Sequence, residues 1–144
     1  QQQLAMEVSR AEAEVVTGTE ACKEKSVGLL KEMGLPNGLP PLEEMEEFGY
    51  VRETGYVWLR QKREAKHTFK KIGKVVAYGE EVTGIIEKGK IRRLGGVKSK
   101  ELLLWISVSE IVVDPADPSK ITFRTPAGLY RTFPSSAFLL PPPN

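Results

Sequence analysis

The sequence predicts a single α+β domain, mostly β, in which an N-terminal helix packs on a curved antiparallel sheet or flattened barrel. Small and apolar residues near the N-terminus recur at steps of three and four, which is the period of a helix. From Phe48 onward the period falls to two, which is the period of a strand. Turns then follow one another too closely for crossover helices, so the strands must pair antiparallel. The length of 144 residues fits one domain.

Three segments are expected along the chain. Residues 15–138 form the single β-rich domain, which follows an N-terminal extension over residues 1–14. Met6 is a candidate natural start, in which case the residues before it were added for expression. Residues 139–144 form a proline-rich tail that cannot join a sheet.

The helix is expected from a stripe of small and apolar residues that runs from position 8 to position 33. Thr17 and Glu20 have the spacing of a capping box, so the helix restarts there and residues 18–33 are its more secure half. Gly34 supplies a C-terminal stop. The side chains that we expect this helix to bury are Leu29, Leu30 and Met33.

Short strands are expected after the helix, near residues 47–52, 55–62, 66–70, 74–87, 89–94, 100–113, 120–125 and 129–133. The turns between them are predicted at "ETG", "EKGK", "LGG", "DPADPS" and "TPAG". The stretch "ELLLWISV" is apolar on both faces, which favours a central strand that is covered on both sides and buries Trp105. The helix is the expected cover.

Charge is distributed unevenly, although the formal net charge is only +2. Residues 1–50 hold ten acidic and four basic side chains, whereas residues 51–144 hold nine acidic and seventeen basic ones. Thirteen of those seventeen lie in two runs, 60–74 and 88–100. Either the two halves of the fold pair with each other, or the basic runs form a surface for an anionic partner.

The candidate binding site begins at "ETGYVWLRQK", where a turn precedes a strand with two aromatic and two basic residues on one side. These residues are Tyr56, Trp58, Arg60 and Lys62. Such a strand could carry the chain from the core to a basic rim that suits an amphiphile, with the anionic head on the cations and the tail in the apolar interior. Further candidates from the basic runs are Lys70, Lys71, Arg92 and Arg93. The alternative is that the aromatics are plain core residues and the cations pair with glutamates of the helix.

A catalytic role is disfavoured. The chain has no "GxSxG" motif, and His67 is its only histidine, so any serine or cysteine nucleophile would depend on that one residue. Cys22 lies on the apolar stripe of the helix and is expected to be a buried small hydrophobe. Glu80 and Glu81 are adjacent on a strand and therefore point to opposite faces. We expect no metal site and no cofactor.

Membrane-spanning and nucleic-acid-binding classes are also disfavoured. The longest apolar run is interrupted by polar residues and is shorter than the ~20 residues that a spanning helix needs. The basic runs contain too few aromatic residues for a base-stacking platform. We expect a cytoplasmic protein or one at a membrane periphery, and the sequence leaves open a secretory signal that has been removed.

Several stretches resemble one family closely and occur in that family's order: "GYVRETGYVWLRQK", "EVTGIIEKGKI", "GVKSKELLLWI" and "KITFRTPAGLYRTFPSSAF". Over roughly residues 15–138 the chain resembles the plant family catalogued as domain of unknown function 538. The resemblance implies a β-rich domain with an N-terminal helix, from land plants, whose activity is not settled. It also implies a distant likeness in shape to the lipid-binding domains of bactericidal permeability-increasing proteins, which hold lipid chains between a long helix and a twisted sheet. No site residues follow from that likeness.

The function expected from these observations is non-catalytic binding of an anionic lipid, an amphiphile or an acidic membrane surface. The first alternative is a protein-interaction module that uses the acidic helix or the basic face of the sheet. A hydrolase of unknown substrate is the third.

Overall fold

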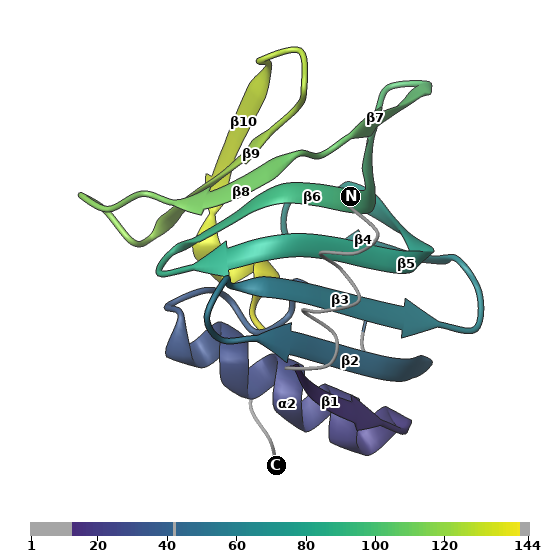
Figure 1. Ribbon diagram of the computed structural model, residues 1–144. Coiled ribbons are helices and arrows are strands. Elements are labelled where there is room, and N and C mark those ends of the chain that lie inside the picture. The colour runs from purple at the N-terminus through teal and green to yellow at the C-terminus, as the bar shows by residue number, and fades with distance from the viewer. Residues whose placement is uncertain (1–12, 42, 142–144) are drawn as a thin grey trace.

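One α-helix, one short 3₁₀ helix and one ten-stranded antiparallel sheet make up the structure, a computed structural model that describes residues 13–41 and 43–141 (Figure 1). The expected helical positions 8–12 and most of the expected N-terminal extension lie outside the described residues. The strands are β1 Glu14–Thr17, β2 Met45–Val51, β3 Tyr56–Gln61, β4 Ala65–Phe69, β5 Lys74–Glu87, β6 Lys90–Glu101, β7 Leu104–Ser107, β8 Glu110–Val113, β9 Lys120–Arg124 and β10 Tyr130–Pro134. The helices are α2 Thr19–Glu32 and the short 3₁₀ helix η1 Ser135–Phe138. The predicted α+β class is confirmed.

The sheet is open, with the strand order β1-β2-β3-β5-β6-β8-β9-β10. The flattened barrel that we considered is therefore wrong, because β1 and β10 lie at opposite edges without pairing. The long strand β5 takes β3 as its neighbour near one end and β4 near the other. In the same way β6 pairs with β8 at one end and with β7 at the other. The two long strands, β5 and β6, lie at the centre of the sheet, and all other strands pair with them directly or through a neighbouring strand.

The helix matches residues 18–33 closely, although it begins differently from the prediction. Gly18, with φ of 91°, occupies the capping position without a side-chain cap, so the predicted capping box does not form. Thr17 belongs instead to β1, where β-branched residues favour an extended backbone that pairs with β2. Gly34 adopts φ of 71° just after the helix, as a C-terminal stop requires. Leu29 and Leu30 are buried as predicted, whereas Met33 is only partly buried.

The largest differences from the predicted strands lie within β6 and at its end, and glycine explains the first. The expected turn "LGG" lies inside β6, where the register with β5 shifts and Gly96 adopts φ of 83°. Glycine in a strand tolerates such a bulge, so the chain bends without turning back.

The second difference concerns "ELLLWISV", which is not a central strand. The chain reverses through a two-residue loop at Leu102 and Leu103, which divides the stretch between the end of β6 and the edge strand β7. The helix packs chiefly against β1 and β2, at the opposite end of the sheet, so it does not cover this hairpin (Figure 1). Trp105 is 37% exposed and is therefore not the core residue that the sequence predicted.

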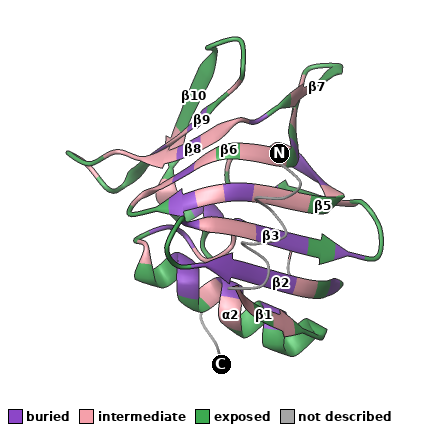
Figure 2. Ribbon diagram, in the orientation of Figure 1, coloured by how far each residue is buried: buried purple, intermediate pink, exposed green. Residues whose placement is uncertain are grey.

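Among the strands, burial is densest in β2 and β3, at the helix end of the sheet, while the β6–β7 and β9–β10 hairpins are largely exposed or intermediate (Figure 2). We call the sheet face on which α2 packs the inner face, and the opposite face the outer face. Phe138 of η1 is buried on the inner face, where its ring stacks on Phe123 with centroids 5.0 Å apart. The Tyr78 hydroxyl donates a 2.6 Å hydrogen bond to the carbonyl of Leu39 and ties the loop after α2 to the sheet.

Candidate functional site

The aromatic pair of β3 lies on the outer face of the sheet. Leu59 belongs to the hydrophobic core, so by strand alternation Tyr56 and Trp58 point away from α2. The Trp58 indole lies across Gly49 and donates a 2.7 Å hydrogen bond to a carboxylate oxygen of Glu47. Its ring is 5.8 Å from that of Tyr56, and Trp58 is only 5% exposed. The two aromatics therefore share one face, as predicted, but Trp58 is packed into the structure.

Tyr56 is less deeply buried than Trp58, and its surroundings are unfavourable for an anion. Burial raises the pKa of the Tyr56 hydroxyl, and the nearby carboxylate of Glu81 raises it further. Arg60, on the same side of β3, lies 3.8 Å from the Glu47 carboxylate. Because acidic groups flank the aromatic pair, this part of β3 is a poor receptor for an anionic head group.

Part of the basic charge is neutralised by the acidic N-terminal half of the chain. Arg52 pairs with Glu14 and Glu32, and Arg63 pairs with Glu44. Together with the Arg60 pair, these contacts match the alternative in which cations and glutamates join the two halves of the fold.

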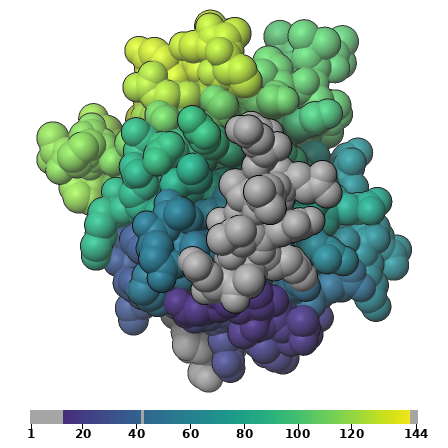
Figure 3. Space-filling view, in the orientation of Figure 1, coloured from purple at the N-terminus to yellow at the C-terminus, as the bar shows by residue number. Residues whose placement is uncertain are grey.

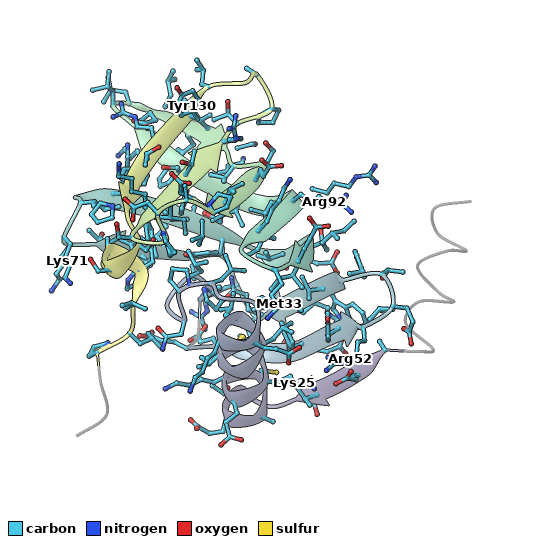
Figure 4. All side chains as sticks on the ribbon, turned by 90° about the vertical axis from the view of Figure 1, so that its left-hand side faces the viewer. Lys25, Met33, Arg52, Lys71, Arg92 and Tyr130 are labelled. Atoms are coloured by element: carbon cyan, nitrogen blue, oxygen red, sulfur yellow. The ribbon has the colours of Figure 1, made fainter. Side chains whose placement is uncertain are left out.

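The remaining predicted cations do not form one surface. Lys62 lies in the exposed β3–β4 turn, and Lys70 and Lys71 lie in the exposed β4–β5 turn. Arg92 pairs with Glu87 near the other end of β5, and Arg93 is exposed beside it. Lys71 and Arg92 lie on opposite sides of the molecule (Figure 4). The strand rise of ~3.3 Å per residue puts them on the order of 30 Å apart along β5.

An apolar cavity lies between α2 and the sheet, where the resemblance implied a lipid-binding space. Its volume is about 100 Å³, and its lining includes Leu29, Phe48, Leu59 and Tyr78. A cavity of ~150 Å³ holds no more than a benzene molecule. The space between helix and sheet is therefore too small for an acyl chain.

The sequence did not predict an exposed leucine cluster at the end of the β6–β7 hairpin. Leu102, Leu103 and Leu104, which we call the leucine tip, are 94%, 91% and 67% exposed. Leu102 also adopts φ of 56°, a left-handed conformation that favours glycine over leucine. Leucine is thus unfavourable at position 102 for two reasons: its apolar side chain is exposed to water, and its backbone is in the left-handed conformation. The run lacks the glycine, proline or asparagine that normally reveals a turn, which is why the stretch was interpreted as a continuous strand.

Three lysines lie on the outer face next to the leucine tip. Lys66 of β4 and Lys98 of β6 face the same residue of β5, and Lys100 lies directly opposite Trp105. The ammonium groups of Lys66 and Lys100 lie 5.3 and 5.8 Å from the centre of the Trp105 ring. Within the described part of the chain, none of the three lysines forms an ion pair. We call Lys66, Lys98 and Lys100 the lysine triad.

A second hairpin, β9–β10, projects from the same end of the molecule as the leucine tip (Figure 3). Leu129 and Tyr130 at its end are 66% and 64% exposed. The Arg124 guanidinium lies 5.4 Å from the centre of the Tyr130 ring. Both hairpins thus present large apolar side chains next to cations.

The residues considered for catalysis do not converge. His67 is exposed and makes an edge contact with Phe69, with ring centroids 4.6 Å apart. Cys22 is buried in α2, and burial, followed by the charge of Glu47, raises the pKa of its thiol, which disfavours the reactive thiolate. Among residues 13–41 and 43–141, no group of three or more histidine, cysteine, aspartate or glutamate side chains could hold a metal ion. No helix of that part is long and apolar enough to cross a membrane.

These features define a small β-rich domain whose sheet extends well past its single packed helix and ends in two apolar-tipped hairpins. The chain belongs to the family described as "Protein of unknown function, DUF538", whose sequence pattern matches residues 26–139. The family predicted from the quoted stretches is thereby confirmed. No curated protein and no solved structure is detectably similar to the chain.

Proposed function

We propose that this protein is a non-catalytic binding domain that attaches to anionic membrane surfaces through its β6–β7 hairpin. The observation that carries the proposal is the leucine tip, three consecutive exposed leucines beside three lysines that form no ion pair within the described residues. An apolar tip suits the hydrocarbon edge of a bilayer, and the lysine triad suits its anionic head groups.

The two parts of this surface contribute comparable free energies. Burying one exposed leucine completely contributes at most ~1.5–3 kcal/mol, and a leucine that reaches only the interface contributes less. Each cation near an anionic leaflet contributes ~1 kcal/mol. Because neither part alone is strong, we expect binding that requires both anionic lipid and the leucines, and that weakens with salt.

Vesicle sedimentation tests the proposal, with neutral and anionic vesicles at low and physiological salt. The leucine variant is Leu103→Ser, at a loop position where the side chain is almost fully exposed. The triad variant reverses the charge of Lys66, Lys98 and Lys100. Its matched control reverses Lys23, Lys31 and Arg93, exposed residues of α2 and of the β6 half that pairs with β8, which changes the net charge equally away from the leucine tip.

The expected result is salt-sensitive binding of the wild type to anionic vesicles only, with a loss of more than tenfold in the triad variant and a clear loss in Leu103→Ser. The matched control should retain most of the affinity. Failure of the wild type to bind either vesicle would reject the membrane proposal and favour a protein partner for the hairpin. Loss confined to the matched control would instead place the binding surface at the helix end of the sheet.

A further inference from the structure

A groove separates the two projecting hairpins on the inner face of the sheet. It is bounded by β6 and β7 on one side and by β9 and β10 on the other, and its volume is about 350 Å³. Its walls are mainly apolar, and they include Leu102, Ile106, Val108, Phe123, Leu129 and Phe133. This volume falls within the ~300–1,000 Å³ of ordinary small-ligand sites, whereas the cavity under α2 does not.

The groove begins where the core ends. Phe138 closes the core at this point, with its ring centroid 5.0 Å from that of Phe123 and 6.0 Å from that of Phe133. Phe123 and Phe133 also line the groove. The apolar surface of the core thus continues past Phe138 into a space that α2 does not fill, because α2 packs at the opposite end of the sheet.

Cations outnumber acids around the groove. The Glu101 carboxylate forms ion pairs with two cations, with N–O distances of 2.6 Å to Lys74 and 3.0 Å to Arg131. Arg124 also lines the groove, and its own acidic partner is Glu110, 3.5 Å away. The Arg131 side chain is 63% exposed despite its contact with Glu101, so it remains accessible to a second anionic group. An apolar trough with a cationic wall is complementary to an anionic amphiphile.

The groove also meets the surface that we assign to the membrane. Leu102 belongs to the leucine tip and lines the groove at the same time, and Leu129 does the same on the β9–β10 hairpin. A hydrocarbon chain that leaves a bilayer at the tips can therefore reach Phe123 and Phe133 along continuous apolar surface. No other hollow described above joins the leucine tip to an apolar interior.

We infer that this groove binds the acyl chain of a single-chain anionic amphiphile, with the chain against Phe123 and Phe133 and the anionic head group at Arg131. The inference rests on the proposed membrane attachment for the route by which the ligand arrives. It adds a ligand class and a site, and it places the ligand at the opposite end of the sheet from the helix.

The test is displacement of a fluorescent fatty-acid analogue from the full chain in solution, without vesicles, by dodecanoate below its micelle concentration. Dodecanol serves as the uncharged competitor and dodecyl phosphate as a second anionic one. Two variants fill the groove: Ile106→Trp in β7 and Leu129→Trp in an exposed loop, where a larger side chain leaves the fold intact. Arg131→Gln removes the cation and keeps the shape.

The wild type is expected to bind dodecanoate, and each tryptophan variant should weaken it by tenfold or more. Arg131→Gln should weaken dodecanoate and dodecyl phosphate while leaving dodecanol unchanged. Equal losses for all three competitors would overturn the head-group assignment. Absence of displacement by any of them, or unchanged binding in Leu129→Trp, would overturn the groove itself.

Leu103→Ser separates this inference from the proposed function, because Leu103 belongs to the leucine tip but not to the lining of the groove. This variant should bind anionic vesicles more weakly than the wild type and bind dodecanoate with unchanged affinity. If the wild type binds dodecanoate but no vesicles, membrane attachment is wrong while the groove stands. If it binds vesicles but no amphiphile in solution, the groove is wrong while the membrane surface stands.

Discussion

The two ends of the sheet differ in how far they bury a tryptophan on the same face. Trp58, on the outer face at the helix end of the sheet, is 5% exposed, and its indole lies across Gly49 and donates a hydrogen bond to Glu47. Trp105, at the far end, lies on the same outer face between lysines and is 37% exposed. The run of leucines beside Trp105 is more apolar than the sequence around Trp58, yet it is the exposed one. What packs on a strand decides its burial, and apolarity alone does not.

The inner face shows the same contrast. At the helix end, α2 and the loop after it leave a cavity of only about 100 Å³. At the hairpin end, nothing among the described residues fills the groove of about 350 Å³. One end of the sheet is therefore built for stability, and the other holds the surfaces that we propose bind lipid.

The largest expected effect compares the two tryptophans directly. Trp58→Ala should lower the free energy of unfolding by ~3–5 kcal/mol, because it leaves a cavity over Gly49 and removes one hydrogen-bond donor to Glu47. Trp105→Ala should lower it by about 1 kcal/mol or less, because the ring is partly solvated and lies next to the ammonium groups of exposed lysines. Urea unfolding of both variants measures the difference. Equal losses would mean that the hairpin end is as much a part of the core as the helix end.

The next effect tests how tightly the helix end is packed on its outer face. A Cβ at Gly49 would lie 2.2 Å from the Trp58 ring, so Gly49→Ala should destabilise the protein by ~1–3 kcal/mol. Gly28 is the control, since a Cβ there meets nothing within 4 Å and the residue lies inside α2. Gly28→Ala should stabilise by ~0.5–1 kcal/mol, and equilibrium unfolding should give the two changes opposite signs.

A third substitution asks whether the leucine tip serves the fold at all. Leu102→Gly should raise the free energy of unfolding by about 1 kcal/mol, because glycine relieves the strain at φ of 56° and removes no buried contact. Leu104→Gly is the control: this residue lies in β7, where glycine should cost ~0.5–1 kcal/mol. Leu102→Gly should nevertheless bind anionic vesicles more weakly than the wild type. A variant that is both less stable and unchanged in vesicle binding would assign Leu102 to the fold.

The sequence predicted the regular parts of the fold well, because they depend on local periodicity. β5 was placed at 74–87 with both ends correct, since alternation and a following turn define it. The hairpin end was mispredicted for a tertiary reason. An apolar run predicts a buried strand, but this one is exposed because α2 is short and packs chiefly on β1 and β2. The turn at Leu102 gave no compositional signal, because it contains leucine where glycine is usual.

The candidate site was predicted less well, because it depends on distances that a sequence does not contain. The alternation correctly put Tyr56, Trp58 and Arg60 on one side of β3. It could not show that Glu47 and Glu81 lie on the strands to either side and supply acidic neighbours. Lys70 and Lys71 lie far from Arg92 and Arg93, although the two basic runs are close in sequence, because β5 is long. The lysine triad comes from β4 and β6, and only the pairing of both strands with β5 brings it together.

The smallest expected effect concerns the ion pairs at the helix end, in which Glu14 of β1 contacts Lys25 of α2 and Arg52 just after β2. Hydrogen bonds from Lys25 and Arg52 hold the pKa of the Glu14 carboxyl below its ordinary value of 4.5. A depressed folded-state pKa stabilises the protein above the unfolded-state value, and that stabilisation disappears as the pH falls through the folded-state value. Because Glu14 is 39% exposed, solvent screening limits the contribution at pH 7 to a few tenths of a kcal/mol, up to about 1. The free energies of unfolding of the wild type and Glu14→Gln, measured with urea between pH 7 and pH 3, should therefore converge as the pH falls. At pH 7 the difference between them should be smaller in about 1 M salt. A difference that widened toward low pH would show that the carboxyl is not held in its charged form.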